Sequence, residues 1–217
     1  MGNPHVTLDR RQFVTRTGIG ALAIGLGAFP LSALAETVDM AELMKPGALP
    51  ENALGAEDAP VTVVEYASMT CGHCANFHKD AFPHLKKEYI DTGKVRYVFR
   101  EFPLDPVAAA AFMLARCAPE GKYFDVVDLL FEDQRAWAFT DNPYNSLLNF
   151  AKQIGFTQES FDACLKDQTL LDGINGIKDR AAQEFGVSST PTFFFNGKKE
   201  SGAQSIEQLD TAIGKLL

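Results

Sequence analysis

Apolar and polar positions along the chain predict two strands joined by a helix. Residues 61–67 are rich in β-branched side chains and have the length of a buried strand. Residues 71–90 have helical patterning, interrupted by Pro83, which we expect to kink or split the helix. Residues 95–102 form a second apolar run. A strand, a helix and a strand in this order predict a βαβ unit with parallel strands and a right-handed crossover.

A hairpin and a final helix are predicted near the C-terminal end. Two strand-like runs, 192–196 and 198–201, meet at an Asn-Gly pair, a dipeptide that favours tight hairpins. Ser205 is placed to cap a helix over 206–216. These C-terminal elements are therefore expected to form a ββα unit.

The intervening residues, 104–186, have almost entirely helical patterning. Asp105 is placed to cap the first helix, with Pro106 at its first position. Glycines and prolines divide the rest into further helices, expected at 122–138, 144–154, 157–166 and 170–185. The predicted fold is therefore α/β, a thioredoxin fold (βαβ + ββα) interrupted by an all-helical insertion. Its thioredoxin-like part comprises residues 61–103 and 187–217.

Residues 1–35 have the features of a signal peptide. Three arginines precede an apolar run over 18–34, which ends in an Ala-Leu-Ala sequence suited to cleavage after Ala35. The short, glycine-rich run disfavours the alternative, a membrane anchor. The arginine pair resembles a twin-arginine signal, although Asp9 stands where Ser or Thr is usual, so the twin-arginine and Sec routes both remain open. We expect export to the periplasm, with residues 36–60 forming an N-terminal arm.

The chain is acidic, with 20 Lys and Arg against 28 Asp and Glu and a formal net charge of −8. Removal of a signal peptide that contains three arginines makes the remaining chain more acidic still. An acidic protein without a basic tract is a poor candidate for binding nucleic acid. We therefore expect no nucleic-acid partner.

The candidate chemistry is concentrated in Cys71-Gly72-His73-Cys74, where the first predicted strand ends and the helix begins. Two cysteines on the first helical turn can close a disulfide with little backbone movement, and the helix N-terminus favours the thiolate of Cys71. We expect Cys71 to be the exposed sulfur, stabilised further by the His73 imidazole, and Cys74 to be its less exposed partner.

Zinc binding is the alternative, but these cysteines make only one pair, and His78 is an awkward third ligand. We therefore expect no metal and no cofactor.

With these motifs in place, residues 61–74 and 187–194 together resemble a bacterial DsbA-type thiol:disulfide oxidoreductase. The resemblance covers residues 57–217 in order and spacing. It implies that the Thr190–Pro191 peptide bond is cis and that Pro191 lies against the Cys-x-x-Cys motif. It further implies that Thr190 offers its backbone to an extended substrate peptide.

The resemblance also implies a role for Glu65, six residues before the first cysteine. In the family, an acid at this position lies behind the cysteine pair and moves protons to and from the second cysteine, here Cys74. Since Val63 and Glu65 share one face of the strand, we expect Glu65 to be buried; a solvent-facing glutamate on an edge strand is the alternative. The Gly72-His73 dipeptide departs from the Pro-His of the best-known DsbA and matches protein disulfide isomerase, which leaves the redox potential open.

Two further cysteines, Cys117 and Cys164, lie on different predicted helices. Each shares an apolar stripe with residues at helical spacings, so both sulfurs are expected to face the packing between helices. Two free, buried thiols are the alternative. Because an exported oxidase should not keep spare thiols in an oxidising compartment, we predict a structural disulfide between them.

These expectations define an exported oxidoreductase that donates disulfide bonds to newly secreted proteins. The resemblance implies two partners: reduced, unfolded secreted proteins as substrates, and a membrane quinone-coupled, DsbB-like protein that reoxidises the enzyme. A disulfide isomerase or reductase on the same fold is the first alternative. Such isomerases usually carry a dimerisation domain, for which residues 36–60 are too short, so we expect a monomer. A non-enzymatic holdase for exported chains is the second alternative.

Overall fold

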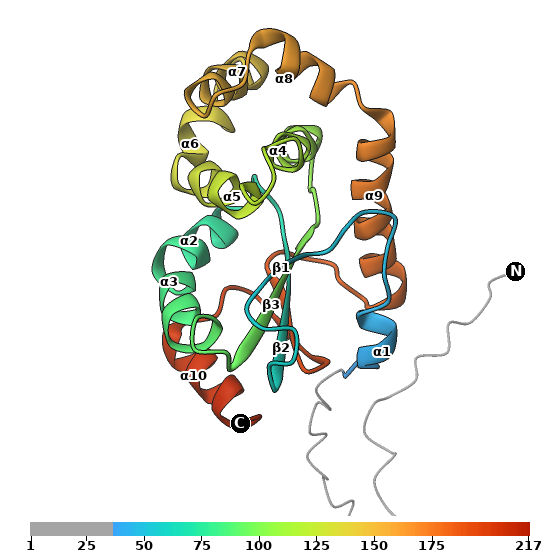
Figure 1. Ribbon diagram of the computed structural model, residues 1–217, viewed down its shortest axis with the longest axis vertical. Coiled ribbons are helices and arrows are strands. Elements are labelled where there is room, and N and C mark those ends of the chain that lie inside the picture. Colours follow the sequence, from blue (N-terminus) through green and yellow to red (C-terminus); the bar gives the residue numbers. More distant parts are fainter. Residues whose placement is uncertain (1–36) are drawn as a thin grey trace, which may run out of the picture. The chain divides into compact units, whose positions relative to one another are not determined.

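The computed structural model describes residues 37–217, and the expected signal peptide lies outside the described residues. In the described part, five strands form one mixed sheet in the order β1-β3-β2-β4-β5 (Figure 1). β2 and β3 are parallel, and the other neighbouring pairs are antiparallel. The predicted βαβ unit and the C-terminal hairpin are thereby confirmed. The strands are β1 (Asn52–Leu54), β2 (Val61–Ala67), β3 (Val95–Glu101), β4 (Thr192–Phe195) and β5 (Lys198–Ser201).

Alternation along β2 sends neighbouring side chains to opposite faces of the sheet. Val64 packs in a cluster with residues of α1 (Met40–Leu43) and α9 (Gln168–Glu184). Val63, on the other face, belongs to the larger core, which also includes residues of α2 (Gly72–Asp80), α3 (Phe82–Leu85) and α10 (Ile206–Gly214). Helices therefore cover both faces (Figure 1), and β2 is buried along almost its whole length.

The helix that follows β2 is split, as Pro83 predicts. It comprises α2 (Gly72–Asp80), α3 (Phe82–Leu85) and a π-helical turn, η1 (Lys86–Ile90). Proline has no N–H to donate to the carbonyl four residues earlier, and its ring crowds that carbonyl. The helical hydrogen-bond ladder is interrupted at this point, so the segment covering the sheet bends between α2 and α3.

The segment between β3 and β4 is helical, as predicted, with one difference from the expected elements. The single helix expected over 122–138 is two, because the chain leaves helical geometry at Asp133. The Asp105 cap is present, its carboxylate accepting from the Ala108 N–H at 2.8 Å. Among the described residues, no helix combines the length and apolarity needed to cross a membrane. The helices before α9 are α4 (Pro106–Arg116), α5 (Tyr123–Glu132), α6 (Gln134–Trp137), α7 (Pro143–Gln153) and α8 (Gln158–Leu165).

The N-terminal arm contains one strand that the sequence analysis did not predict. The arm begins with α1, which is capped by the Asp39 side chain. β1 follows and pairs antiparallel with β3 at the edge of the sheet. Its three residues, Asn-Ala-Leu, are too few to produce an alternating pattern, so their strand conformation comes from the neighbouring strand rather than from local propensity.

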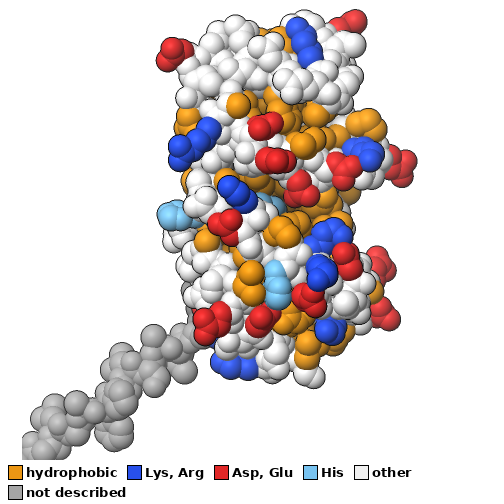
Figure 2. Space-filling model, turned by 90° about the vertical axis from the view of Figure 1, so that its left-hand side faces the viewer, with side chains coloured by type: hydrophobic (Ala, Val, Ile, Leu, Met, Phe, Trp, Pro, Cys, Tyr) orange, Lys and Arg blue, Asp and Glu red, His pale blue; other side chains and the backbone are white. Residues whose placement is uncertain are grey.

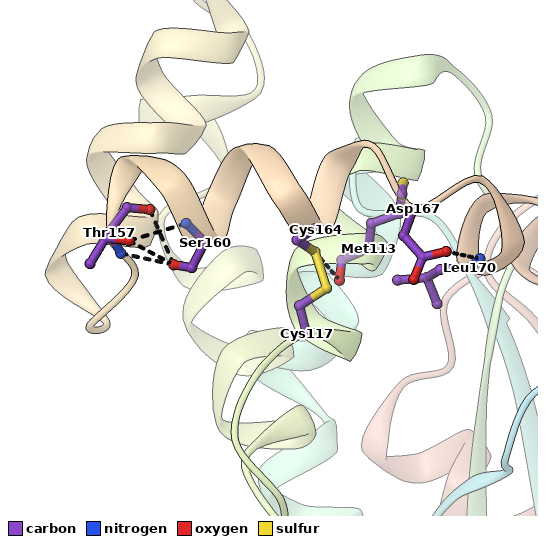
Figure 3. Close-up of a disulfide and its surroundings, with 7 residues drawn as sticks. All are labelled: Met113, Cys117, Thr157, Ser160, Cys164, Asp167 and Leu170. Atoms are coloured by element: carbon purple, nitrogen blue, oxygen red, sulfur yellow. Dashed lines mark hydrogen bonds between the residues drawn. A yellow bond between two sulfur atoms is a disulfide. The ribbon is translucent and has the colours of Figure 1, made fainter.

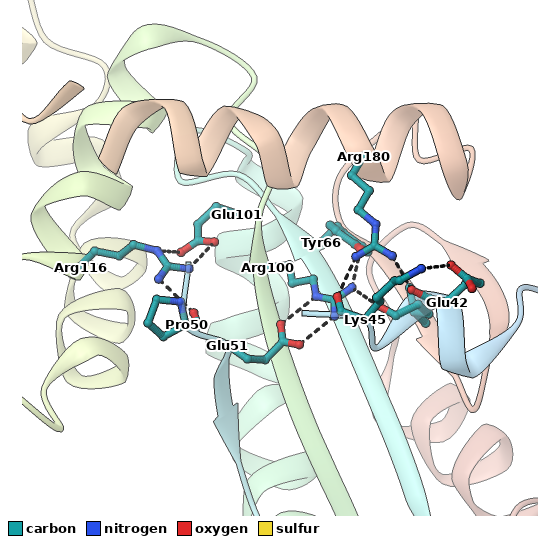
Figure 4. Close-up of polar contacts among 10 residues, drawn as sticks. Glu42, Lys45, Pro50, Glu51, Tyr66, Arg100, Glu101, Arg116 and Arg180 are labelled. Atoms are coloured by element: carbon teal, nitrogen blue, oxygen red, sulfur yellow. Dashed lines mark hydrogen bonds and ion pairs between the residues drawn. The ribbon is translucent and has the colours of Figure 1, made fainter. Parts of the chain in front are cut away.

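Two arginines hold this arm against the sheet and α9 (Figure 4). Arg100 of β3 makes a bidentate ion pair with Glu51, its Nε and Nη2 lying 2.9 and 2.8 Å from the two carboxylate oxygens. The Arg100 Nη1 also donates to the Leu43 carbonyl at 2.8 Å. Arg180 of α9 donates to the Lys45 carbonyl at 2.7 Å. The arm is therefore fixed to the folded part of the chain at several points.

Cys117 and Cys164 form a disulfide that ties the end of α4 to α8 (Figure 3). Their Cα atoms are 6.1 Å apart, within the range that a disulfide spans. The bond joins positions 47 residues apart in the sequence. The structure therefore has the bonded pair and not the two free thiols that were the alternative.

The ion pair between Arg116 and Glu101 provides a test of the packing. Its Nε–Oε1 and Nη2–Oε2 distances are 2.6 and 3.0 Å, and Glu101 is fully buried. Because Arg116→Ala leaves this carboxylate buried without its cation, we expect the free energy of unfolding to fall by about 3 kcal/mol. Lys122→Ala is the control, since its exposed pair with Asp125 contributes little. Urea denaturation measures both variants, and similar small losses in the two would contradict the expectation.

Candidate active site

Cys71 occupies the capping position at the N-terminus of α2. A turn leads into it, in which the Cys71 N–H donates to the Ser68 carbonyl at 3.0 Å. Cys74 lies one turn further along α2 and is fully buried, whereas Cys71 keeps 9% of its surface exposed. Both are free thiols. The prediction of an exposed Cys71 is therefore wrong in degree, because neighbouring segments cover most of it, although it remains the more accessible sulfur.

One of these neighbouring segments is the loop before β4. The Thr190–Pro191 peptide bond is cis, as the resemblance implies. The Cys71 Sγ lies 3.2 Å from the Thr190 carbonyl oxygen, in position to donate to it as a thiol. The two residues meet because β4 pairs with β2, with Thr192 opposite Tyr66. The sheet therefore places the loop directly against the first cysteine.

The surroundings of Cys71 favour its thiolate. The pKa of Cys71 is lowered to about 5, chiefly by a hydrogen bond from the Cys74 thiol, while burial acts in the opposite direction. The Thr190 side chain and the backbone N–H groups of Cys74 and His73 add smaller contributions to this low pKa. His73 thus acts here through its backbone, and its side chain is exposed. The expected help from its imidazole is not among the main causes of the lowered pKa.

The pKa of Cys74 shifts in the opposite direction from that of Cys71. Burial raises the pKa of Cys74 well above its usual value, and the adjacent Cys71 and the charge of Glu65 raise it further. The two sulfurs therefore differ in both access and acidity. At neutral pH the pair therefore consists of the Cys71 thiolate, nearer the surface, and the buried Cys74 thiol.

Glu65 lies in the middle of β2 and is fully buried, so the interpretation based on strand alternation is correct. Its Oε2 accepts a hydrogen bond from the Tyr97 hydroxyl of β3 at 2.5 Å. Burial, followed by the charge of Glu65, raises the pKa of Tyr97 well above its usual value. Tyr97 therefore remains a neutral donor, and a carboxyl group is held inside the sheet on the side of Cys74.

The sequence predicts no role for His78 beyond that of an awkward third metal ligand. In the structure it is buried on α2, with its Nε2 3.5 Å from the Glu65 Oε2 and its Nδ1 3.7 Å from the Asp128 Oδ1 of α5. A signal for this placement was available, because His78 lies four residues after Cys74, and positions i and i+4 share one helix face.

Gln134 of α6 is a second residue that the sequence analysis did not identify. It is buried, and its Nε2 donates to the Met69 carbonyl at 2.8 Å and to the Cys71 carbonyl at 3.1 Å. The helical segment thus holds the active-site turn from outside the sheet. No motif marks this glutamine, since its partners are backbone groups more than sixty residues away in the sequence.

A reactive dithiol at the start of a helix, facing a cis-proline loop in a sheet of this strand order, defines a thioredoxin-fold redox protein. Residues 48–215 match the family model described as Thioredoxin. The crystal structure of Wolbachia pipientis alpha-DsbA1 is similar, with a TM-score of 0.73 and 34% sequence identity, over 81% of this chain and 94% of that chain. BdbD from Bacillus subtilis is also similar, with a TM-score of 0.65 and 26% identity, over 76% of this chain and 92% of that one. This chain therefore belongs to the thioredoxin family and is of the DsbA type.

Curated relatives point to the same class. A putative protein-disulfide oxidoreductase of Rickettsia felis is 36% identical over 166 residues, which are 76% of this chain and 59% of the relative. One from Rickettsia bellii is 38% identical over 76% of this chain and 63% of its own length. The chain thus spans about three fifths of the length of the curated relatives it matches.

The low pKa of Cys71 makes the stability of the reduced protein depend on pH. Since the pKa is about 5 in the folded state and about 8.5 for a free cysteine, the stabilisation is fully present above about pH 8.5 and is lost as the pH falls towards 5. We expect the free energy of unfolding, relative to Cys71→Ser, to rise with pH across this window. Urea unfolding under reducing conditions measures it, and a difference that stays constant with pH would argue against the low pKa.

Proposed function

We propose that this protein is an exported thiol:disulfide oxidoreductase that donates disulfide bonds to newly secreted proteins through Cys71-Gly72-His73-Cys74. The observation that carries the proposal is the unequal placement of the two sulfurs, with Cys71 at the N-terminus of α2 beside the Thr190 carbonyl and Cys74 fully buried. This placement lowers the pKa of Cys71 to about 5 and raises that of Cys74. A stabilised thiolate favours the reduced form of the pair. A protein whose reduced form is favoured passes its disulfide on to other thiols.

The reaction proceeds in two exchanges. A substrate thiolate attacks the Cys71 Sγ of the oxidised pair, the Cys71–Cys74 bond breaks, and the Cys74 thiolate takes up a proton. A second substrate thiolate then attacks the substrate sulfur of this mixed disulfide, and Cys71 leaves as a thiolate. A low pKa makes Cys71 a good leaving group in this second step. Glu65, buried on the side of Cys74, is the group we assign to the exchange of the Cys74 proton.

Substrate contact is assigned to the surface around Cys71. The loop with Thr190 and Pro191 has backbone groups next to the reactive sulfur, suited to an extended peptide. Leu104 is 51% exposed, and its N–H donates to the Ser68 hydroxyl at 3.2 Å, which places an apolar side chain beside the active-site turn. Loose apolar contact of this kind suits unfolded chains of varied sequence.

Export to the periplasm, by the twin-arginine or the Sec route, remains part of the proposal. A signal peptide over residues 1–35 is its sequence basis, and the Cys117–Cys164 disulfide is consistent with an oxidising compartment. We propose a monomer that is reoxidised by a membrane quinone-coupled, DsbB-like protein. The Gly72-His73 pair, which matches that of protein disulfide isomerase, makes isomerisation the second candidate activity.

The test is oxidation of a reduced, unfolded protein substrate by the oxidised enzyme without its signal peptide. We expect catalysed disulfide formation, its complete loss in Cys71→Ser, and its retention in the double variant Cys117→Ala/Cys164→Ala, which lacks only the other disulfide. Thiol titration of the substrate over time measures the rate. Equal activity in Cys71→Ser would refute the mechanism, and rapid repair of a scrambled substrate without net oxidation would favour the isomerase.

A further inference from the structure

Each cycle of the proposed reaction moves one proton onto and off Cys74, deep in the protein. Cys74 and Glu65 are both fully buried. A carboxyl group inside the sheet can exchange a proton with the sulfur, but that proton must still reach water. The proposed reaction therefore needs a connection from Glu65 to the surface.

His78 lies between Glu65 and the surface. Its side chain is 3% exposed, and its two nitrogens point to different carboxylates, Nε2 towards Glu65 at 3.5 Å and Nδ1 towards Asp128 at 3.7 Å. Among the described residues neither nitrogen has a hydrogen-bond partner within bonding geometry, and the same holds for the Glu65 Oε1. Buried polar atoms are rarely left unpaired in proteins, so this set of three side chains calls for an explanation.

Aromatic rings fix the orientation of the imidazole. The His78 ring stacks on Phe131 with a centroid distance of 4.3 Å and lies 4.8 Å from the ring of Phe82. Phe99 contacts it edge-on at 5.6 Å. A ring held in this way cannot easily turn, so its two nitrogens keep facing the interior and the exterior respectively.

The outer end of the connection is open to solvent. The Asp128 side chain is 53% exposed. His78 and Asp128 both line a groove of about 840 Å³ beside α2, together with Lys79, Lys86 and Glu132. Figure 2 looks onto the face where α2 and α3 lie, and charged side chains are interspersed with hydrophobic ones across it.

From this arrangement we propose that His78 relays protons between Glu65 and Asp128, and so connects the buried cysteine with water in the groove. The proposal rests on the proposed function, because only a dithiol that cycles needs such a path. It makes His78 a proton-relay residue rather than a group that touches the substrate.

The relay is used when the enzyme disulfide closes. In a mixed disulfide between Cys71 and an oxidant, the Cys74 thiol loses its proton to the Glu65 carboxylate. The Cys74 thiolate attacks the Cys71 Sγ, the bond from Cys71 to the oxidant breaks, and the oxidant sulfur leaves as a thiolate. Glu65 passes its proton to the Nε2 of His78, which releases the Nδ1 proton towards Asp128. The only redox change is the thiol–disulfide exchange itself, and the relay moves protons alone.

This sequence leaves His78 in its other tautomer, and the second half of the cycle restores it. When the oxidised enzyme reacts with a substrate thiolate, Cys74 is released and needs a proton. The proton then travels inward, from Asp128 through His78 to Glu65. Because the two half-reactions move protons in opposite directions, the stacked ring never has to turn over.

The charges around His78 suit this task. Glu65 faces it from β2 and Asp128 from α5, Tyr97 of β3 reaches it through Glu65, and α3 contributes only the ring of Phe82. Burial lowers the pKa of His78, but the two carboxylates outweigh it and raise the pKa above the usual value. A carboxylate therefore faces each nitrogen of the imidazole, which is the arrangement that proton transfer through the ring requires.

The test follows closure of the reduced protein with oxidised glutathione as the probe. Formation of the mixed disulfide at Cys71 and its closure by Cys74 are separated by acid quenching at several pH values. In His78→Gln we expect unchanged formation and closure slowed about tenfold or more at mildly acidic pH. The deficit should shrink as the pH rises, because a higher hydroxide concentration speeds the slower loss of the Cys74 proton that does not use the relay. A merely structural defect would slow closure equally at all pH values.

Asp128→Asn is the second variant. Because Asp128 is exposed, this substitution should not disturb folding, and we expect closure to slow less than in His78→Gln, with the same pH dependence. Glu132→Gln, in the same groove, and His84→Gln, which is bonded to Asp210, are matched controls with no expected effect. Closure within twofold of wild type at every pH in both relay variants would overturn the relay. Because the probe is glutathione, a wild type that fails on protein substrates would refute the proposed function alone.

Discussion

The pairing of β2 with β4 is the constraint on which the rest of the structure depends. The chain leaves the sheet after β3, forms the helical segment, and returns to place Phe193 opposite Glu65. This register brings the Thr190 carbonyl within 3.2 Å of the Cys71 Sγ, across 119 residues of sequence. The same pairing puts β2 in the centre of the sheet, so that Glu65 has a neighbouring strand on each side, β3 and β4. Site and fold are therefore set by one strand register.

Burial differentiates two chemically identical side chains. Cys71 stands at the start of α2, where N–H groups and the Cys74 thiol stabilise its thiolate, whereas Cys74 lies beneath it beside a buried carboxyl group. A dithiol with one acidic and one protonated sulfur passes its disulfide on easily. The same burial that suppresses ionisation of Cys74 also isolates its proton from water, and the proposed relay through His78 and Asp128 would reconnect them.

Much of this was predictable from sequence where the signal is local. Alternation along β2 predicted that Glu65 is buried, and Pro83 predicted the break between α2 and α3. Contacts between distant segments left no such trace. β1 is too short for a pattern and depends on β3, while Gln134 binds backbone carbonyls of the active-site turn. His78 shared a helix face with Cys74, but its partner Asp128 comes from a helix whose position follows only from the packed core.

The redox equilibrium of the Cys71–Cys74 pair with glutathione tests the central claim most directly. If the Cys71 thiolate stabilises the reduced form, the potential of the pair must be more oxidising than that of thioredoxin, about −270 mV. We expect a potential clearly above that figure, measured from the fraction of oxidised protein across a series of glutathione ratios. A potential at or below that of thioredoxin would contradict the assignment of this protein as a disulfide donor.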